Sequence, residues 1–317
     1  RTTRTNQDSA PRIRPRVVVE SAGSMDFNVE TLGPCHIPTC CPTSRYVTDE
    51  DRVSFHSEMK LVRAALQQGE EPPSFEVAGP RKQIFFDPQR LACAIVTCGG
   101  LCPGLNDVIR AIVLSLHYLY GVKRVFGIPY GYQGLVPAFD LEWRELAPQV
   151  VSNIHHEGGT ILGSSRGPQD VPTMLDALQK RDVGVLFAIG GDGTLRGARR
   201  IAEEVQRRNL PLGVIGLPKT IDNDIAFMER SFGFETAVGA TRNAVTAAHA
   251  EAQSYPNGIG LVKLMGRHSG FLSAHAALST GDVNFCLVPE VPFVLEEGEY
   301  GFLPELKRRL EHRNHAV

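Results

Sequence analysis

Short apolar runs alternate with helical patterns from residue 92 to the end of the chain, and this alternation restricts the possible fold more than any other feature. The run Ala92–Cys98 is almost entirely apolar, and Leu212–Leu217 is apolar between two prolines. Such runs are typical of strands buried in a parallel sheet. Between them, apolar residues recur every three or four positions, as in amphipathic helices that cross over a sheet. The sequence therefore predicts an α/β fold with mostly parallel sheets.

The predicted elements follow one another in a regular order. Strands are expected at residues 92–98, 122–128, 183–189, 212–217, 260–265 and 284–288, and helices at 105–119, 195–205, 236–253, 269–278 and 302–313. A short helix is also expected between Asp49 and Gln68, and the ordered core is expected to begin near Lys82. His315–Val317 read as the start of a further strand, which predicts that the chain stops short of a complete second domain.

Composition excludes several classes of partner. The formal net charge is −2 and the basic residues are scattered, so no nucleic acid is expected. No apolar stretch approaches the ~20 residues that a membrane span needs. The seven cysteines lack paired zinc-ligand spacing, which favours a reducing compartment. We therefore expect a cytoplasmic protein, with the chloroplast stroma as the alternative. The arginine-rich residues 1–16 fit either a transit segment or a disordered tail.

Two carboxylates stand two residues apart directly after the fourth predicted strand, in the segment Pro218–Asp224. Ligands of parallel sheets bind beyond the carboxyl ends of the strands. Asp222 and Asp224 are therefore expected at a ligand site, beside Lys219 and Thr220. The alternative is an Asx-rich turn, because Asp and Asn side chains bond to their own backbone in turns.

The loop Gly190–Thr194, with Gly197 one turn later, follows a predicted strand and opens a helix. Glycines let backbone amides approach a phosphate, and the helix N-terminus favours an anion. The glycine spacing fits neither the dinucleotide fingerprint nor the Walker sequence. Asp192 inside such a loop would repel phosphate unless it held a divalent cation, so it is interpreted as a Mg²⁺ ligand. The alternative is a tight turn with an Asp cap.

Two further loops offer groups that suit phosphate chemistry. Gly99–Gly104 is a second strand-to-helix glycine loop, and Gly163–Gly167 carries Arg166 between flexible glycines. A guanidinium suits the charge that develops on a transferred phosphoryl group, although exposed arginines are more often surface residues. Phosphoryl transfer requires mainly positioning and charge neutralisation. The combined loops and the carboxylate pair therefore indicate a small-molecule kinase.

The order and spacing of these motifs resemble the 6-phosphofructokinases. The matching segments are Thr97–Asn106, Gly190–Thr194, Pro218–Asp224, Met265–Arg267 and Pro289–Glu290. The resemblance extends over residues 78–317 and is strongest to the plant and algal ATP-dependent branch, which shares runs like Val262–Phe271 and Cys286–Phe293. It implies two Rossmann-like three-layer domains with mostly parallel sheets, the second incomplete in this chain.

The resemblance implies roles for individual residues. Asp222 is the implied general base that takes the proton of the sugar 1-hydroxyl, with Thr220, Arg166 and Lys219 also in catalytic positions. Asp192 and Asp224 are the implied Mg²⁺ ligands. Nucleotide contacts are implied for Gly99, Arg166, Asp192, Gly193, Thr194 and Gly197. Sugar-phosphate contacts are implied for Thr220, Asp222, Asp224, Met265, Gly266, Arg267 and Glu290.

Gly193 decides the predicted phosphoryl donor. Pyrophosphate-dependent relatives carry Asp at this position, where the carboxylate would fill and repel the place of an ATP α-phosphate, whereas Gly193 leaves that place open. Lys219 is the residue of pyrophosphate users, but plant ATP-dependent enzymes combine both features. ATP is therefore the predicted donor, with a pyrophosphate-dependent enzyme as the first alternative.

Three departures from the family pattern bear on this prediction. Gly258 stands where bacterial enzymes have an arginine lent by a neighbouring subunit, and Pro129–Tyr130 differs from the usual loop on the adenine side. Further ligands for the sugar 6-phosphate are absent after Val317. A non-catalytic, regulatory or inactive truncated relative is accordingly the second alternative.

The resemblance implies a glycolytic enzyme that makes fructose 1,6-bisphosphate from fructose 6-phosphate, with ATP and Mg²⁺, and forms a homo-oligomer, a dimer or tetramer. Residues 1–80 are expected to form a largely irregular arm. Residues 81–233 are expected to form a nucleotide-binding α/β domain, and residues 234–317 a sugar-phosphate-binding α/β domain.

Overall fold

The structure is a computed structural model that describes residues 27–296 and 301–317, and the chain divides into two compact units. The smaller unit contains residues 45–80 and the described residues before Leu32, and the larger unit contains residues 32–44 and 81–317. The arginine-rich start of the chain lies outside the described residues. All of the predicted site residues belong to the larger unit.

The smaller unit is an antiparallel strand pair with one helix. Its elements are β2 (Arg52–Ser54), α1 (Met59–Gln67) and β3 (Ser74–Glu76), with β2 paired to β3. The rings of Phe27, Phe55 and Phe75 pack against one another with centroids 4.9 to 6.1 Å apart. The short helix predicted in this region is confirmed, and the two strands are additional.

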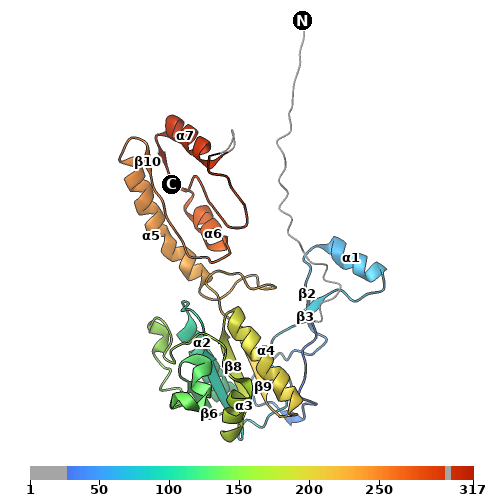
Figure 1. The fold of residues 1–317 in the computed structure, drawn as a ribbon. Helices are drawn as coiled ribbons and strands as arrows, with labels where there is room; N and C mark the ends of the chain where they lie inside the picture. Colours follow the sequence, from blue (N-terminus) through green and yellow to red (C-terminus); the bar gives the residue numbers. More distant parts are fainter. Residues whose placement is uncertain (1–26, 297–300) are drawn as a thin grey trace. The chain divides into compact units, whose positions relative to one another are not determined.

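A five-stranded sheet forms the centre of the larger unit (Figure 1). Its strands, in spatial order, are β7 (Arg144–Glu145), β6 (Arg124–Ile128), β5 (Ala92–Thr97), β8 (Val183–Gly190) and β9 (Gly213–Pro218). All neighbouring strands run parallel except β6 and β7, which are antiparallel. All six residues of β5 are buried, which explains its continuous apolar run. The four parallel strands confirm the four predicted in this part of the chain.

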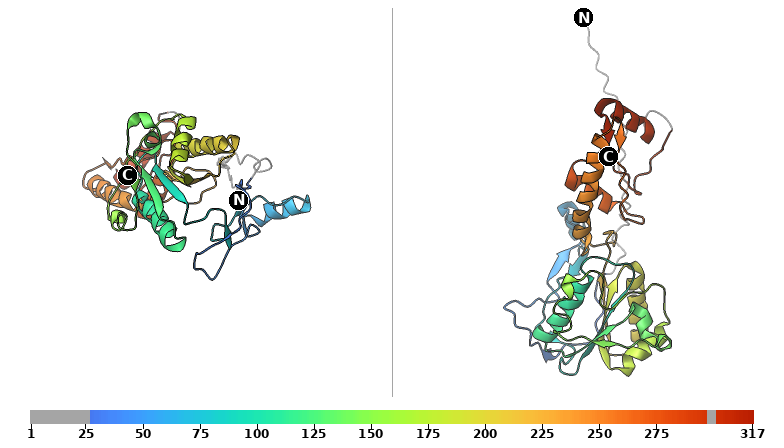
Figure 2. Two further views of the ribbon diagram at one scale, coloured as in Figure 1. Left: turned by 90° about the horizontal axis from the view of Figure 1, so that it is seen from below. Right: turned by 90° about the vertical axis from the view of Figure 1, so that its left-hand side faces the viewer.

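Helices cover both faces of this sheet (Figure 2). They are α2 (Leu105–Leu114), which continues as the π-helical turn η2 (Ser115–Leu119), α3 (Val171–Lys180) and α4 (Asp192–Arg207). Successive residues of a strand face opposite sides. Cys93 and Ile95 of β5 accordingly pack with α2, whereas Ala94 and Val96 pack with α3 and α4. This three-layer arrangement confirms the predicted α/β class.

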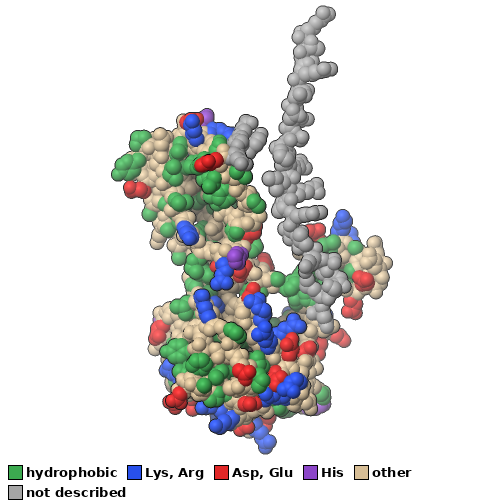
Figure 3. Space-filling model, viewed as in Figure 1, with side chains coloured by type: hydrophobic (Ala, Val, Ile, Leu, Met, Phe, Trp, Pro, Cys, Tyr) green, Lys and Arg blue, Asp and Glu red, His purple; other side chains and the backbone are tan. Residues whose placement is uncertain are grey.

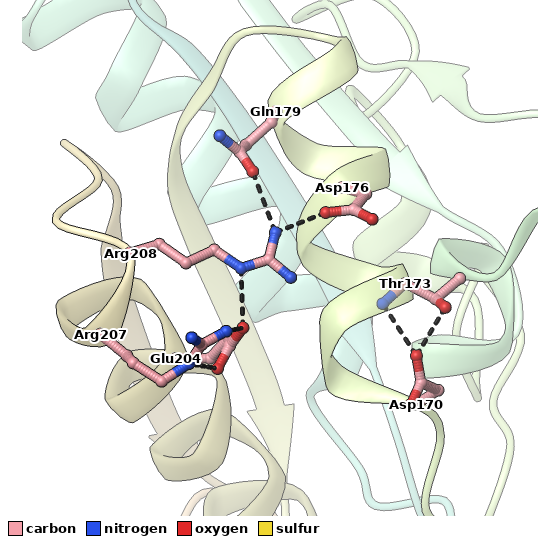
Figure 4. A network of polar contacts seen from close by, with 7 residues as sticks. All are labelled: Asp170, Thr173, Asp176, Gln179, Glu204, Arg207 and Arg208. Atoms are coloured by element: carbon pink, nitrogen blue, oxygen red, sulfur yellow. Dashed lines mark hydrogen bonds and ion pairs between the residues drawn. The ribbon is translucent and has the colours of Figure 1, made fainter.

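Helix α3 was not predicted from the sequence. Asp170 caps its N-terminus by accepting a hydrogen bond from the backbone N–H of Thr173 at 2.9 Å. Arg208, at the end of α4, binds Asp176 and Gln179 of α3 and also Glu204 of its own helix (Figure 4). This network fixes α4, and with it the loop that opens α4, against α3.

Short elements complete the larger unit. The strands β1 (Ile37–Pro38) and β4 (Gln83–Ile84) form an antiparallel pair, and 3-10 turns lie at η3 (Gly131–Leu135), η4 (Pro137–Phe139) and η5 (Ile154–His156). The chain from residue 234 onward contains α5 (Phe234–Gln253), β10 (Gly258–Ile259), α6 (Phe271–Thr280), α7 (Phe302–Arg313) and β11 (His315–Ala316). The three helices and the final strand confirm their predictions.

Two predicted strands are wrong. Residues 260–265 and 284–288 form no strand, because neither segment has a strand beside it along its length. Strand β11 pairs with β10 over two residues, and only Gly260, Asn284 and Phe285 add backbone bonds to the carbonyls of residues 316 and 317. Leu261 is accordingly 88% exposed. Apolar sequence alone predicted these strands, but a strand also requires hydrogen-bonding neighbours.

Among the described residues, no helix combines the length and hydropathy that crossing a membrane would require. The domain boundary predicted after residue 233 stays a prediction; Gly233 is the N-cap of α5.

Candidate active site at the carboxyl edge of the sheet

A cavity with a volume of about 1000 Å³ lies in the larger unit. Its wall contains the residues that directly follow β5, β8 and β9, namely Cys98–Leu101, Gly191–Thr194 and Lys219–Ile221. The carboxyl ends of parallel strands meet at one edge of a sheet, which is the usual place for ligands in open α/β folds. The loop around Arg166 and the segment Lys263–His268 complete the wall.

The turn after β9 is held by side chains other than Asp222. The hydroxyl of Thr220 accepts from the N–H of Asp222 at 3.1 Å and donates to Asp224 Oδ1 at 2.8 Å. Asn223, with φ at +54°, accepts from the N–H of Ser231 and donates to the carbonyl of Glu229. The Asn223 side chain thus bonds to residues six and eight positions further along and forms no Asx-turn, and the Asp222 carboxylate is not used to form the turn.

One oxygen of the Asp222 carboxylate lies near a backbone N–H group, and the other has no hydrogen-bond partner among the described residues. Oδ2 lies 3.5 Å from the backbone N–H of Arg267, and the Asp222 carbonyl accepts from the Ser269 hydroxyl at 3.1 Å. Oδ1 is buried and has no hydrogen-bond partner among the described residues. A buried polar atom without a partner is uncommon. Because Asp222 also lines the cavity, this oxygen is suited to accept a hydrogen bond from a ligand hydroxyl.

The glycine loop between β8 and α4 forms the opposite part of the wall. Thr194 is buried, and its carbonyl accepts from the Tyr132 hydroxyl at 2.8 Å. A Cβ atom at Gly197 would lie 2.6 Å from the Tyr132 ring, so that glycine permits close packing. A Cβ atom at Gly193 would meet no atom within 4 Å. The N-terminal turn of α4 therefore faces the cavity with open space above Gly193, as an anion site at a helix N-terminus requires.

The other two predicted loops are joined to each other. Gly99, with φ at +86°, donates its N–H to the carbonyl of Ser165 at 3.0 Å and accepts from the Ser164 hydroxyl at 2.6 Å. A Cβ atom at Gly100 would lie 3.3 Å from a guanidinium nitrogen of Arg166. The guanidinium of Arg166 thus lies next to the glycine turn after β5.

Lys219 connects these loops to the carboxylate turn. Its side chain is buried, and Nζ donates to the carbonyl of Gly100 at 2.6 Å. Burial lowers the pKa of Lys219, and the charge of Arg166 lowers it further, whereas Asp222 acts in the opposite direction. The ammonium group therefore lies between the Gly99–Gly104 loop and the Arg166 loop. An anionic ligand bound there would stabilise its charged form.

Basic side chains outnumber acidic ones in the cavity wall. The acidic ones are Asp192, Asp222 and Asp224, and the basic ones are Arg166, Arg196, Arg200, Lys219, Lys263 and Arg267. This balance suits ligands with several negative charges. Figure 3 shows basic side chains gathered over α4.

Four of the residues in the wall were missed by sequence reasoning: Arg196, Arg200, Lys263 and His268. A signal existed for Arg196 and Arg200, because residues four apart lie on one face of a helix and both follow the glycine loop. Lys263 and His268 belong to a segment without regular structure, so no periodicity indicates where their side chains lie.

All predicted site residues except one line this cavity. The exception is Glu290, whose carboxylate oxygens accept from the backbone N–H of Gly270 at 2.8 and 3.0 Å. Gly270 is the N-cap of α6, so Glu290 satisfies a backbone donor at that helix end. Its predicted contact with a sugar phosphate stays a prediction.

The carboxylates in the wall fit a magnesium ion. No group of three or more His, Cys, Asp or Glu side chains that could hold a metal is found in residues 27–296 and 301–317. Mg²⁺, however, is usually bound by one or two carboxylates together with substrate phosphates. Asp192 and Asp224 line the same cavity and are both exposed, and Asp192 lies 3.7 Å from Arg196.

Comparison with known proteins gives consistent results. The family model described as Phosphofructokinase matches residues 92–316. An ATP-dependent 6-phosphofructokinase of Borreliella burgdorferi is 47% identical over 293 residues, which cover 90% of this chain and 65% of the relative. ATP-dependent 6-phosphofructokinase 7 of Arabidopsis thaliana is 51% identical over 243 residues, which cover 77% of this chain and 49% of the relative.

Solved structures agree with the fold. The crystal structure of Pichia pastoris phosphofructokinase in the T-state superposes with a TM-score of 0.61 at 28% identity, over 74% of this chain and 25% of the other. The chain spans 65% and 49% of the length of the two curated relatives described above.

Proposed function

The chain belongs to the phosphofructokinase family, and from this premise we propose that it transfers the terminal phosphoryl group of ATP to the 1-hydroxyl of fructose 6-phosphate. The observation that carries the proposal is that Asp222, with a buried and unpartnered Oδ1, lines the same cavity as the glycine loop Gly191–Thr194. Relatives from a bacterium and a plant that are 47% and 51% identical over 293 and 243 aligned residues are named as ATP-dependent 6-phosphofructokinases, which supports this activity.

In the proposed reaction, Asp222 accepts the proton of the sugar 1-hydroxyl as the oxygen bonds to the γ-phosphorus of ATP. The bond between that phosphorus and the bridging oxygen breaks, and ADP leaves. Phosphoryl transfer needs positive charge near the phosphate oxygens. Arg166 and Lys219 provide it, because both line the cavity and lie at the Gly99–Gly100 turn, where Lys219 is bonded to the Gly100 carbonyl.

The two ends of the cavity are assigned to the two substrates. Met265, Gly266 and Arg267 contact the sugar phosphate, supported by their place in the cavity wall and by the position of the Arg267 N–H, 3.5 Å from Asp222 Oδ2. Thr220 positions Asp222 through the hydrogen bond to its N–H and also contacts the sugar. Gly99 and the N-terminal turn of α4 contact the nucleotide phosphates.

Magnesium is proposed as the required ion. Asp192 on the nucleotide side and Asp224 on the substrate side would hold it. When bound, Mg²⁺ neutralises charge on the phosphate oxygens. Asp192 lies 3.7 Å from Arg196, and both side chains are exposed, so the carboxylate is accessible to an ion.

The donor is proposed to be ATP because of the space at Gly193, where a Cβ atom would meet nothing within 4 Å. Pyrophosphate is the second candidate donor, because Lys219 is the residue that pyrophosphate-dependent relatives carry at this position. The Lys219 ammonium is bonded to the Gly100 carbonyl at 2.6 Å and would serve the phosphates of either donor.

A coupled assay that follows fructose 1,6-bisphosphate formation tests the proposal. The protein should turn over fructose 6-phosphate with ATP and Mg²⁺ and not with pyrophosphate. Turnover with pyrophosphate alone would replace ATP as the donor. No turnover with either donor, in a protein that still binds ATP by calorimetry, would support a non-catalytic relative.

Membership of the same family also supports a proposal for the roles of the two domains and for the oligomeric state. We place nucleotide binding in residues 81–233 and sugar-phosphate binding in residues 234–317, in a cytoplasmic homo-oligomer. Analytical ultracentrifugation should find a dimer or tetramer, and a monomer at micromolar concentration would contradict this.

A further inference from the structure

A pair of histidine rings lies where α5, β11 and the turn after α6 meet. His249 of α5 and His315 of β11 bring their Nε2 atoms to 3.3 Å, with ring centres 5.2 Å apart and planes 34° apart. Neither ring lines the cavity described above, and the proposed reaction uses neither. The pair therefore needs a separate explanation.

Each ring is held at Nδ1 by a group that only accepts hydrogen bonds. His249 Nδ1 lies 3.4 Å from Asp282 Oδ1, and His315 Nδ1 lies 3.0 Å from the backbone oxygen of Arg313. A carbonyl has no hydrogen to donate, so Nδ1 of His315 carries its ring hydrogen, and the Asp282 carboxylate favours the same tautomer of His249. In this tautomer of the neutral rings, both Nε2 atoms present lone pairs to the space between them. Two lone pairs at this distance repel unless a metal ion or a proton lies between them.

The distances agree with a shared metal ion. Two imidazoles that bind one tetrahedral ion at about 2.0–2.1 Å place their nitrogens about 3.3–3.4 Å apart and their ring centres about 5.2 Å apart. A head-on N–H···N bond of 3.3 Å would separate the ring centres by about 5.6 Å, and 3.3 Å is long for a hydrogen bond with a mode near 2.9–3.0 Å. The observed 3.3 and 5.2 Å match the first arrangement.

We propose that His249 and His315 bind one divalent transition-metal ion of the Zn²⁺ class. Imidazole suits zinc, copper and nickel, whereas magnesium and calcium prefer oxygen. Metal-bound histidines usually donate their other N–H to a carboxylate or a backbone carbonyl, and these are the two groups found here. Since no third His, Cys, Asp or Glu converges on a metal-holding group within the described residues, water completes the coordination. The His249 side chain is 20% exposed, which leaves access to solvent.

One acidic and one basic side chain, Asp282 and Arg309, lie near the histidine pair. Asp282 supports a cation through His249, at 3.4 Å. Arg309 donates to the carbonyl of His315 at 3.2 Å, so its charge is engaged on the backbone side of that residue. An ion held here would bridge α5 to β11, whose backbone pairs with β10 over two residues.

Calorimetric titration with ZnCl₂, compared among variants, tests the site. Cysteines elsewhere also bind zinc, so the difference between variants is the measurement. His249→Gln and His315→Gln should each bind one ion fewer per chain than the unsubstituted protein. His312→Gln is the matched control, because His312 has the same Nδ1 contact to a backbone carbonyl, at 2.7 Å, and should retain the ion. Asp282→Asn should weaken the site about 10–100-fold.

Equal zinc stoichiometry in all variants would overturn the proposal. A proton shared between the two Nε2 atoms would then explain their distance. If the histidine variants fold poorly, anomalous diffraction at the zinc edge from crystals of the unsubstituted protein should place a peak between the two Nε2 atoms. Zinc peaks that occur only at other positions in the protein would contradict the proposal. Asp222→Asn should bind zinc normally, so this test does not depend on the kinase activity.

Discussion

Two glycines in the first two turns of α4, Gly193 and Gly197, have different structural roles. The space above Gly193 is open within 4 Å, whereas a Cβ atom at Gly197 would lie 2.6 Å from the ring of Tyr132. That ring cannot easily move, because its hydroxyl is bonded to the Thr194 carbonyl. At the scale of residues, Gly193 is therefore a candidate for function and Gly197 for packing.

Alanine substitutions should separate these two roles. Gly193→Ala and Gly197→Ala both add helix propensity, so the difference between them reports the contact with Tyr132. Gly197→Ala should be less stable than Gly193→Ala by about 1–3 kcal/mol, the usual effect of overpacking. Urea unfolding measures this difference. Equal stability would show that the Tyr132 ring adjusts without cost.

A charged side chain at residue 193 should act on nucleotide binding. Gly193→Asp should weaken ATP binding by more than tenfold, because like charges brought together cost several kcal/mol. Gly193→Asn, of the same size and without charge, is the matched control and should lose less affinity. Calorimetry with ATP measures both. Unchanged binding in Gly193→Asp would remove residue 193 from the nucleotide site.

At the scale of elements, the sequence predicted the strands with long apolar runs and the helices with strong periodicity. It also predicted the loops that line the cavity, because in a parallel sheet every strand-to-helix loop reaches the same edge. It missed α3, whose signals were the Asp170 cap and a proline in the first turn. It wrongly predicted strands at 260–265 and 284–288, because strand pairing is a property of neighbours that sequence periodicity does not contain.

The ion pairs of Glu204 with Arg207 and Arg208 at the C-terminal end of α4 make stability depend on pH. Hydrogen bonds from Arg207 and Arg208 lower the pKa of Glu204 from 4.5 to about 2. A lowered carboxyl pKa stabilises the fold above the ordinary value, and this contribution is lost as the pH falls from 4.5 toward 2. Glu204→Gln should therefore melt below the unsubstituted protein at pH 7, and the two melting temperatures should converge near pH 2.

Glu203→Gln provides the control for Glu204→Gln. Glu203 lies on the same helix but pairs only with the exposed Arg199, at 2.9 Å, and does not contact α3. Exposed pairs contribute little to stability. Its melting temperature should stay close to that of the unsubstituted protein at pH 7. A loss at Glu203 as large as that at Glu204 would show that the pairs with Arg207 and Arg208 are not the source of the effect.

At the scale of the whole molecule, three strand-end loops, the Arg166 loop and the segment around Arg267 form one cavity. Lys219 connects two of these loops directly. A ligand that contacts several of them stabilises the folded chain, because binding to the native state alone shifts the unfolding equilibrium.

ATP with Mg²⁺ should accordingly raise the melting temperature. At a hundredfold excess over Kd, the stabilisation is about 2.7 kcal/mol. Asp222→Asn should be stabilised by ATP to the same extent, since Asp222 acts on the sugar hydroxyl, whereas Gly193→Asp should be stabilised less. An absence of any shift with ATP in the unsubstituted protein would contradict a nucleotide site in this cavity.

The central claim is that the Asp222 carboxylate removes the proton of the sugar hydroxyl while the glycine loop holds ATP. Steady-state turnover of Asp222→Asn with ATP and fructose 6-phosphate tests it most directly, with Glu229→Gln as a control that removes a charge from the same loop. The account predicts that kcat falls by about 10²- to 10⁴-fold, the usual contribution of a general base, while the KM for fructose 6-phosphate changes little. Turnover of Asp222→Asn equal to that of the unsubstituted protein would contradict the account.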